Sequence, residues 1–134
     1  MTHVVVVEDD AMNALLFRKL LEKRCGCCVT VTESPEELFA LVRSGEVALV
    51  LMDVSLANSR YQDRAVNGVD LCRILKSDPA TCDVPIVLAT AHAMRGDEEM
   101  LLAESGADDY LSKPVVDHTA FVARIRRSLH SEAA

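Results

Sequence analysis

The segment VVVVEDD, residues 4–10, is a short run of β-branched residues that ends directly in three acids. Four consecutive valines suit a strand that is buried on both faces, as in a parallel sheet covered by helices on both sides. The same pattern recurs in VALVLMD, residues 47–53, which ends in Asp53. We therefore expect two buried strands whose terminal acids meet at one edge of a sheet.

Short apolar runs alternate with longer amphipathic segments along the rest of the chain. The expected strands are 4–7, 28–32, 47–52, 85–89 and 109–112, and the expected helices are 11–23, 35–45, 66–76, 97–105 and 116–129. This alternation predicts an α/β fold, a doubly wound five-stranded parallel sheet with five helices. In open sheets of this kind, sites form beyond the carboxyl ends of the strands.

The helix expected at 11–23 shows how its ends and faces are assigned. Met12, Leu16 and Leu20 recur at four-residue spacing, which predicts that they share a face. Asp10 is interpreted as an acid that starts this helix rather than as a metal ligand. In the next helix, Ser34 is expected to cap the first turn and Pro35 to occupy the first helical position.

Length and composition favour a single-domain protein and argue against several other classes of protein. We expect one domain over residues 1–134, with a core at about 3–130. Lys and Arg total 14 against 21 Asp and Glu, a net charge of −7, which argues against binding to nucleic acid or to an anionic membrane surface. The first apolar run is too short for a signal peptide or a spanning helix. Five cysteines, an odd number, suit free thiols in a reducing compartment, so we expect a cytoplasmic protein.

Residues that could carry chemistry fall at the ends of the expected strands. Acids gather at Glu8, Asp9 and Asp53, Thr90 ends the fourth strand, and Lys113 follows the fifth. Neighbouring carboxylates raise one another's pKa unless a cation lies among them, and Mg²⁺ prefers oxygen ligands. A lysine and a hydroxyl beside them suit an anionic oxygen. The set predicts a site for a phosphoryl group carried on a carboxylate.

Four segments in this order resemble the receiver domain of two-component response regulators. They are VVVVEDD (4–10), LVLMD (49–53), LATAHAMRGDEE (88–99) and GADDYLSKP (106–114). The resemblance spans nearly the whole chain and implies the receiver fold, which is flavodoxin-like. Each segment alone is unspecific, whereas all four at the expected strand ends are highly specific.

The resemblance also implies an acceptor and a metal site. Asp53 matches the phosphoacceptor, Asp9 the direct metal ligand, and Glu8 the second acid of that pair, which usually acts through water. Ser55 matches the position whose main-chain carbonyl completes the coordination. The implied ion is Mg²⁺ or Mn²⁺.

The remaining implied roles concern the response to phosphorylation. Thr90 matches the switch hydroxyl, Tyr110 the switch aromatic that follows it, and Lys113 the lysine that pairs with a phosphate oxygen. Ala91 matches a small position that leaves the phosphate accessible. The implied donor is a phosphohistidine on a histidine kinase or a histidine phosphotransfer protein, and a downstream target protein would read the altered surface.

One segment departs from the family pattern. No proline follows Asp53, and the loop at 55–67 is longer than usual, with Asn67-Gly68 in place of the usual turn. We interpret 58–64 as a polar loop. The insertion is either neutral or a lid or partner contact, and it leaves the geometry of the Ser55 carbonyl open.

Only residues 130–134 follow the last expected helix, so we expect a stand-alone switch that either relays phosphate or binds a target. The alternatives are a receiver-like interaction domain that works without phosphorylation and an aspartate-phosphate hydrolase. Such hydrolases carry a second Asp where Ser55 stands, which argues against an enzyme. A flavin carrier is disfavoured because Asp9 and Asp10 would repel the cofactor phosphate.

The clustered cysteines and the arginines of the last expected helix are interpreted without a specific function. Cys25, Cys27 and Cys28 lie close in sequence, but no second Cys/His pair stands at zinc spacing, so a structural or incidental role is expected. The arginines of the last helix are expected to form a solvated face, with a partner surface as the alternative.

Overall fold

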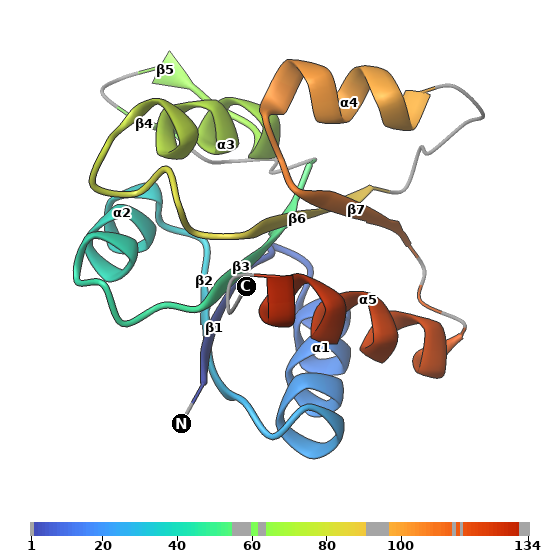
Figure 1. Ribbon diagram of the computed structural model, residues 1–134. Helices are drawn as coiled ribbons and strands as arrows, with labels where there is room; N and C mark the ends of the chain where they lie inside the picture. The colour runs from blue at the N-terminus through green and yellow to red at the C-terminus, as the bar shows by residue number, and fades with distance from the viewer. Residues whose placement is uncertain are drawn as a thin grey trace.

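The computed structural model describes residues 2–54, 60–61, 64–90, 97–113, 115 and 117–131. Five strands form one parallel sheet, and they are β1 (His3–Val7), β2 (Cys28–Thr32), β3 (Leu49–Asp53), β6 (Ile86–Thr90) and β7 (Asp109–Ser112). Their order across the sheet is β2-β1-β3-β6-β7, as Figure 1 shows. The predicted doubly wound parallel sheet is confirmed.

One helix follows each of these strands: α1 (Ala11–Arg24), α2 (Pro35–Arg43), α3 (Gly68–Ser77), α4 (Asp97–Ser105) and α5 (His118–Ser131). Helices α1 and α5 cover one face of the sheet, α2 and α3 cover the other, and α4 lies beside α3 (Figure 1). Within the described ranges, none of the helices has the length and apolarity needed to cross a bilayer.

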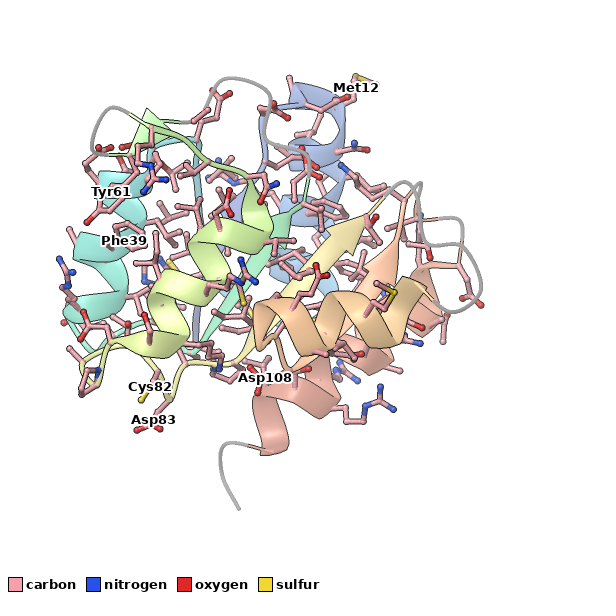
Figure 2. The ribbon with its side chains drawn as sticks, turned by 90° about the horizontal axis from the view of Figure 1, so that it is seen from above. Met12, Phe39, Tyr61, Cys82, Asp83 and Asp108 are labelled. Carbon is pink, nitrogen blue, oxygen red and sulfur yellow. The ribbon has the colours of Figure 1, made fainter. Side chains whose placement is uncertain are left out.

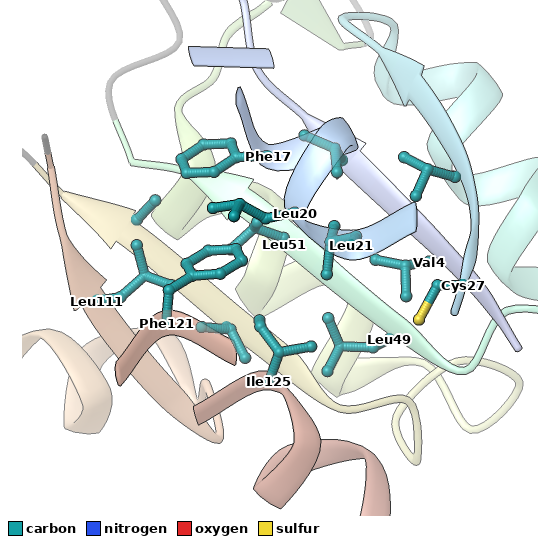
Figure 3. Close-up of a cluster of buried hydrophobic side chains, with 14 of the residues drawn as sticks. Val4, Phe17, Leu20, Leu21, Cys27, Leu49, Leu51, Leu111, Phe121 and Ile125 are labelled. Carbon is teal, nitrogen blue, oxygen red and sulfur yellow. The ribbon is translucent and has the colours of Figure 1, made fainter. Parts of the chain in front are cut away.

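Each face of the sheet carries its own hydrophobic core. Alternate residues of β1 point to opposite faces, so Val4 and Val6 pack with α1 and α5 while Val5 and Val7 pack with α2 and α3. Both valine pairs are fully buried, as expected for a strand covered on two sides. In the first core the rings of Phe17 and Phe121 stack at 5.7 Å and join α1 to α5 (Figure 3).

The buried face of α1 differs from the predicted one. Met12 is 78% exposed, and Leu16 is only partly buried. The side chains that face the sheet are Ala14, Phe17, Leu20 and Leu21. The first turn of α1 projects beyond the end of the sheet, where Met12 points outward (Figure 2). The expected face was therefore wrong at Met12, which lies on the side of α1 opposite Ala14 and Phe17.

The two predicted helix caps, Asp10 and Ser34, are confirmed. Asp10 is the N-cap of α1, and its carboxylate accepts hydrogen bonds from the main-chain nitrogens of Met12 and Asn13. Ser34 caps α2 in the same way, with Pro35 at the start of the helix. These caps fix where each helix leaves the sheet.

The segment expected as a polar loop at 58–64 contains residues of a small two-stranded sheet. Strands β4 (Arg60–Tyr61) and β5 (Arg64–Ala65) pair antiparallel, and the Tyr61 ring meets Phe39 of α2 edge-on at 4.7 Å (Figure 2). Strands of two residues are too short to show a periodic pattern, which explains why the sequence indicated only a loop. Residues 55–59 and 62–63 of this insertion lie outside the described ranges.

Candidate functional site

Three acids meet at the carboxyl end of the two central strands. Glu8 and Asp9 directly follow β1, Asp53 ends β3, and these strands are paired in register with Val7 opposite Met52. Carboxylate oxygens of the three acids all lie within 4.8 Å of one another. Glu8 and Asp53 are 2% and 3% exposed. The sheet therefore brings together the acids that the sequence predicted as a site.

Lys113, which follows β7, completes this group. Its Nζ donates to Oε1 of Glu8 and to Oδ1 of Asp53, both at 3.0 Å. The lysine side chain is only 10% exposed, so both ion pairs are shielded from water. Ion pairs in such surroundings are stronger than exposed ones, and this lysine is held with its charge directed at Asp53.

The clustered carboxylates disfavour one another's charge. Burial raises the pKa of Glu8 to about 7, and the hydrogen bond and charge of Asp53 add to this rise, while Lys113 opposes it. Burial by itself lowers the pKa of Lys113, but its hydrogen bonds to Asp53 and Glu8 outweigh burial, so the net shift is upward. The positive charge of Lys113 thus only partly offsets the effect of burial and of Asp53 on the pKa of Glu8.

The raised pKa of Glu8 predicts a pH-dependent stability in metal-free protein. Below its ordinary pKa of 4.5 Glu8 is protonated both folded and unfolded, and above about 7 the folded protein must bury a charged carboxylate. The free energy of unfolding should therefore fall as pH rises between these values, by on the order of 3 kcal/mol. The variant Glu8→Gln should lose this dependence and be more stable than wild type at about pH 8.

Urea unfolding in the presence of a chelator, from about pH 5 to about pH 8, measures both proteins. Glutamine keeps an acceptor oxygen for Lys113, so Glu8→Gln is matched in shape. An equally steep decline in this variant would contradict the assignment to Glu8.

The donor set fits a hard divalent cation. Carboxylate oxygens in close proximity are the ligands that Mg²⁺ prefers, and a cation would offset the repulsion between Glu8 and Asp53. Glu8, Asp9 and Asp53 would hold the ion. Ser55, predicted to add its carbonyl, lies outside the described residues.

The two other strand ends carry the remaining predicted residues. Thr90 ends β6 and is 7% exposed, and its main-chain oxygen accepts a hydrogen bond from the main-chain nitrogen of Lys113 at 2.8 Å. Tyr110 lies half-buried on β7, three residues before Lys113. Tyr110 therefore lies on the strand that pairs with the strand of Thr90 and leads to Lys113, while Ala91 lies outside the described ranges.

Gly68 is a site residue that the sequence interpretation missed. Its main-chain nitrogen donates to the Val54 carbonyl at 3.0 Å, which places the start of α3 against the backbone of Asp53. A Cβ at this position would collide with the Asp53 carbonyl oxygen and lie 2.9 Å from the Val54 Cα. Asn67 and Asp70 fix this approach through a reciprocal capping box. The sequence showed Asn67-Gly68 as a turn, but no pattern reveals a close approach between distant backbones.

The cysteine cluster shows no sign of chemistry. Burial raises the pKa of Cys25 and of Cys27, which makes their thiols poor nucleophiles. Across the part of the chain that the structure describes, the acids Glu8, Asp9 and Asp53 form the group with metal-binding geometry, and no cysteine joins them.

Comparison with known proteins agrees with this geometry. The family model of the response regulator receiver domain matches residues 4–126. The polar-differentiation response regulator DivK of Brucella ovis is 36% identical over 112 residues, which cover 84% of each protein.

Two solved structures share the fold. A CheY-like response regulator receiver domain protein from Methanospirillum hungatei JF-1 matches with a TM-score of 0.79 and 20% identity, over 99% of this chain and 97% of that one. The receiver domain of the sensor histidine kinase PA1611 from Pseudomonas aeruginosa PAO1, which has a magnesium ion in its active site cleft, matches with a TM-score of 0.78. It is 24% identical, and the match covers 96% of this chain and 98% of that one.

Proposed function

The chain belongs to the response regulator receiver domain family, and from this premise we propose that Asp53 accepts a phosphoryl group from a phosphohistidine. The donor is a histidine kinase or a histidine phosphotransfer protein. The observation that carries the proposal is the contact between Asp53 and Lys113 at 3.0 Å, within the cluster formed by Glu8, Asp9 and Asp53. In this proposal residues 1–134 act as one cytoplasmic receiver unit.

The transfer breaks one bond and forms another. The P–N bond of the donor phosphohistidine breaks, and the imidazole nitrogen keeps the electron pair. An Asp53 carboxylate oxygen forms the new P–O bond. Lys113 is placed to neutralise charge on the phosphoryl oxygens, so the contribution of the protein is positioning and electrostatics. The chain assists its own modification and acts as a signalling acceptor rather than as an enzyme.

The proposed metal site uses Glu8, Asp9 and Asp53, with the Ser55 carbonyl as a further ligand. When bound, Mg²⁺ or Mn²⁺ offsets charge between the carboxylates and the phosphoryl group. Glu8 binds the ion as a carboxylate, so its raised pKa makes proton and metal compete near neutral pH.

The phosphorylated state differs from the resting state by added charge and new acceptor oxygens. In the proposal Thr90 and Lys113 bond to those oxygens, and Tyr110 follows Thr90. Both Thr90 and Lys113 are already joined through their backbones at 2.8 Å. The altered surface is read by a downstream target protein, or the phosphoryl group passes along a relay.

The surface beside the site suits a protein donor. Met12 and Leu15 on α1 are 78% and 50% exposed, and Leu15 lines a cleft of about 390 Å³ together with Asp9 and Arg18. Adjacent exposed apolar side chains commonly mark a contact surface. The proposal therefore places the phosphohistidine-bearing partner over the start of α1, beside the acceptor.

Intact-mass measurement tests the proposed acceptor activity. Incubation with acetyl phosphate and Mg²⁺ should add the mass of one phosphoryl group, and replacing Mg²⁺ by a chelator should slow its appearance at least about tenfold. An equal rate with the chelator would contradict the metal site. No adduct in the presence of Mg²⁺ would overturn the acceptor role and favour an interaction domain that works without phosphorylation.

A further inference from the structure

Arg124 on α5 lies against Tyr110 on β7, the edge strand of the sheet. Its Cζ is 5.3 Å from the centre of the Tyr110 ring, which is within the range of a cation–π contact. Nη1 of the same guanidinium donates to the main-chain oxygen of Tyr110 at 2.8 Å and to Oδ1 of Asp109 at 2.9 Å. One side chain therefore contacts both the ring and the backbone of Tyr110.

Asp109 fixes the direction of this guanidinium. Its side chain is 15% exposed, and it accepts hydrogen bonds from Arg124, from Nη2 of Arg127 at 3.2 Å and from the Tyr110 main-chain nitrogen at 2.9 Å. A shielded carboxylate with several charged partners holds them in defined geometry. Arg124 is thus oriented over the ring rather than free to sample other positions.

The strand that carries Tyr110 also reaches the acceptor. Ser112 lies opposite Thr90 in register, and the next residue, Lys113, contacts Asp53 at 3.0 Å through Nζ. A change at Asp53 that moves Thr90 or Lys113 therefore acts directly on the strand that Arg124 holds.

We propose that Arg124 is a positioning residue that holds Tyr110 in its resting arrangement and so opposes the phosphorylated state. This role rests on the proposed function, because it requires Tyr110 to move when Asp53 is modified. A contact made in one state only shifts the equilibrium toward that state. Linkage makes the effect reciprocal, so removal of Arg124 eases phosphorylation instead of impairing it.

Arg127 provides a matched control on the same helix. Its guanidinium contacts Asp109, and its side chain is 69% exposed. The variants Arg124→Ala and Arg127→Ala each remove one positive charge and one bond to Asp109. Arg124→Ala also removes the cation–π contact and the hydrogen bond to Tyr110.

Tyrosine fluorescence measures how accessible the Tyr110 ring is to a quencher in solution. The chain has two tyrosines and no tryptophan, so in a Tyr61→Phe background Tyr110 is the sole emitter. In unphosphorylated protein, Arg124→Ala should raise the acrylamide quenching of Tyr110, while Arg127→Ala should leave it unchanged. Equal quenching in both variants would contradict the contact that holds the ring.

Beryllium fluoride, added together with Mg²⁺, mimics the phosphoryl group. Titration with it measures how strongly each variant favours the resting state over the phosphorylated state. The midpoint concentration should fall about three- to tenfold in Arg124→Ala and by less than about twofold in Arg127→Ala. The Arg124 effect should vanish in a Tyr110→Ala background. Arg124→Lys, which keeps the charge but loses the planar fork, should give an intermediate shift if the alanine variant folds poorly.

The outcomes separate the two proposals. If wild type neither binds beryllium fluoride nor forms an adduct, the proposed acceptor function fails, and the role of Arg124 fails with it. If wild type responds normally and the two arginine variants shift equally, or Arg124→Ala raises the midpoint, only the role of Arg124 is overturned.

Discussion

Replacement of Asp53 by asparagine is expected to abolish the phosphoryl adduct completely. An amide nitrogen and a neutral carbonyl oxygen replace the carboxylate that forms the P–O bond, so no acyl phosphate can form. Asp53 is also one of three acids whose oxygens lie within 4.8 Å of one another. Its loss therefore removes the acceptor and a metal ligand in one step.

The same variant should fold at least as well as wild type. The neutral amide would end the repulsion between the carboxylates of Asp53 and Glu8, and Lys113 would keep its bond to Glu8 at 3.0 Å. The thermal midpoint of metal-free Asp53→Asn should be equal to or higher than that of wild type. A lost adduct in a stable protein then reports chemistry and not unfolding.

Asp83→Asn is the matched control for this change. Asp83 is exposed and lies at the opposite end of the molecule from Met12, which marks the outer end of α1 (Figure 2). It should form the adduct at the wild-type rate. An adduct on Asp53→Asn as large as that on the control would contradict the assignment of the acceptor.

Gly68→Ala should impair the site without touching a charged group. The new Cβ meets backbone atoms of Asp53 and Val54, which cannot rotate away as a side chain can. We expect a loss of at least about 2 kcal/mol in the free energy of unfolding. The acceptor backbone must also shift, so adduct formation should slow at least about tenfold, because small misplacements of reacting groups are costly.

Gly45→Ala is a control that separates the loss of stability expected for Gly68→Ala from its slower adduct formation. Gly45 has a φ of +80°, so alanine there costs stability through backbone strain, yet no atom lies within 4 Å of the added Cβ. This control should lose roughly 1 kcal/mol and form the adduct normally. Urea unfolding and the rate of mass increase measure both variants. A wild-type rate in Gly68→Ala would contradict the close packing of α3 on Asp53.

The sheet and most of the site could be predicted because their determinants are local in sequence. Runs such as Val4–Val7 indicate buried strands, and an acid directly after a strand must lie at its carboxyl end. Because the carboxyl ends of parallel strands lie at the same edge of a sheet, Glu8 and Asp53 are expected to lie close together. The contacts of Lys113 with both acids follow from the same rule.

The remaining features depend on contacts that no short pattern encodes. Arg124 belongs to a helix with a polar face, and only its position over Tyr110 distinguishes it from Arg127. Packing of Tyr61 on Phe39 joins an insertion to α2, and no pattern around Tyr61 indicates this distant partner. Gly68 matters through backbone proximity, a property of three-dimensional packing alone.

The most direct test of the account is to locate the phosphoryl group on the wild-type chain. Borohydride reduces an acyl phosphate to the alcohol, which converts a phosphorylated aspartate into homoserine and marks its position permanently. After treatment with acetyl phosphate and Mg²⁺, peptide mass spectrometry should find this conversion at Asp53 and at no other residue. Conversion at a different aspartate, or a phosphoryl group carried on a histidine instead, would contradict the account.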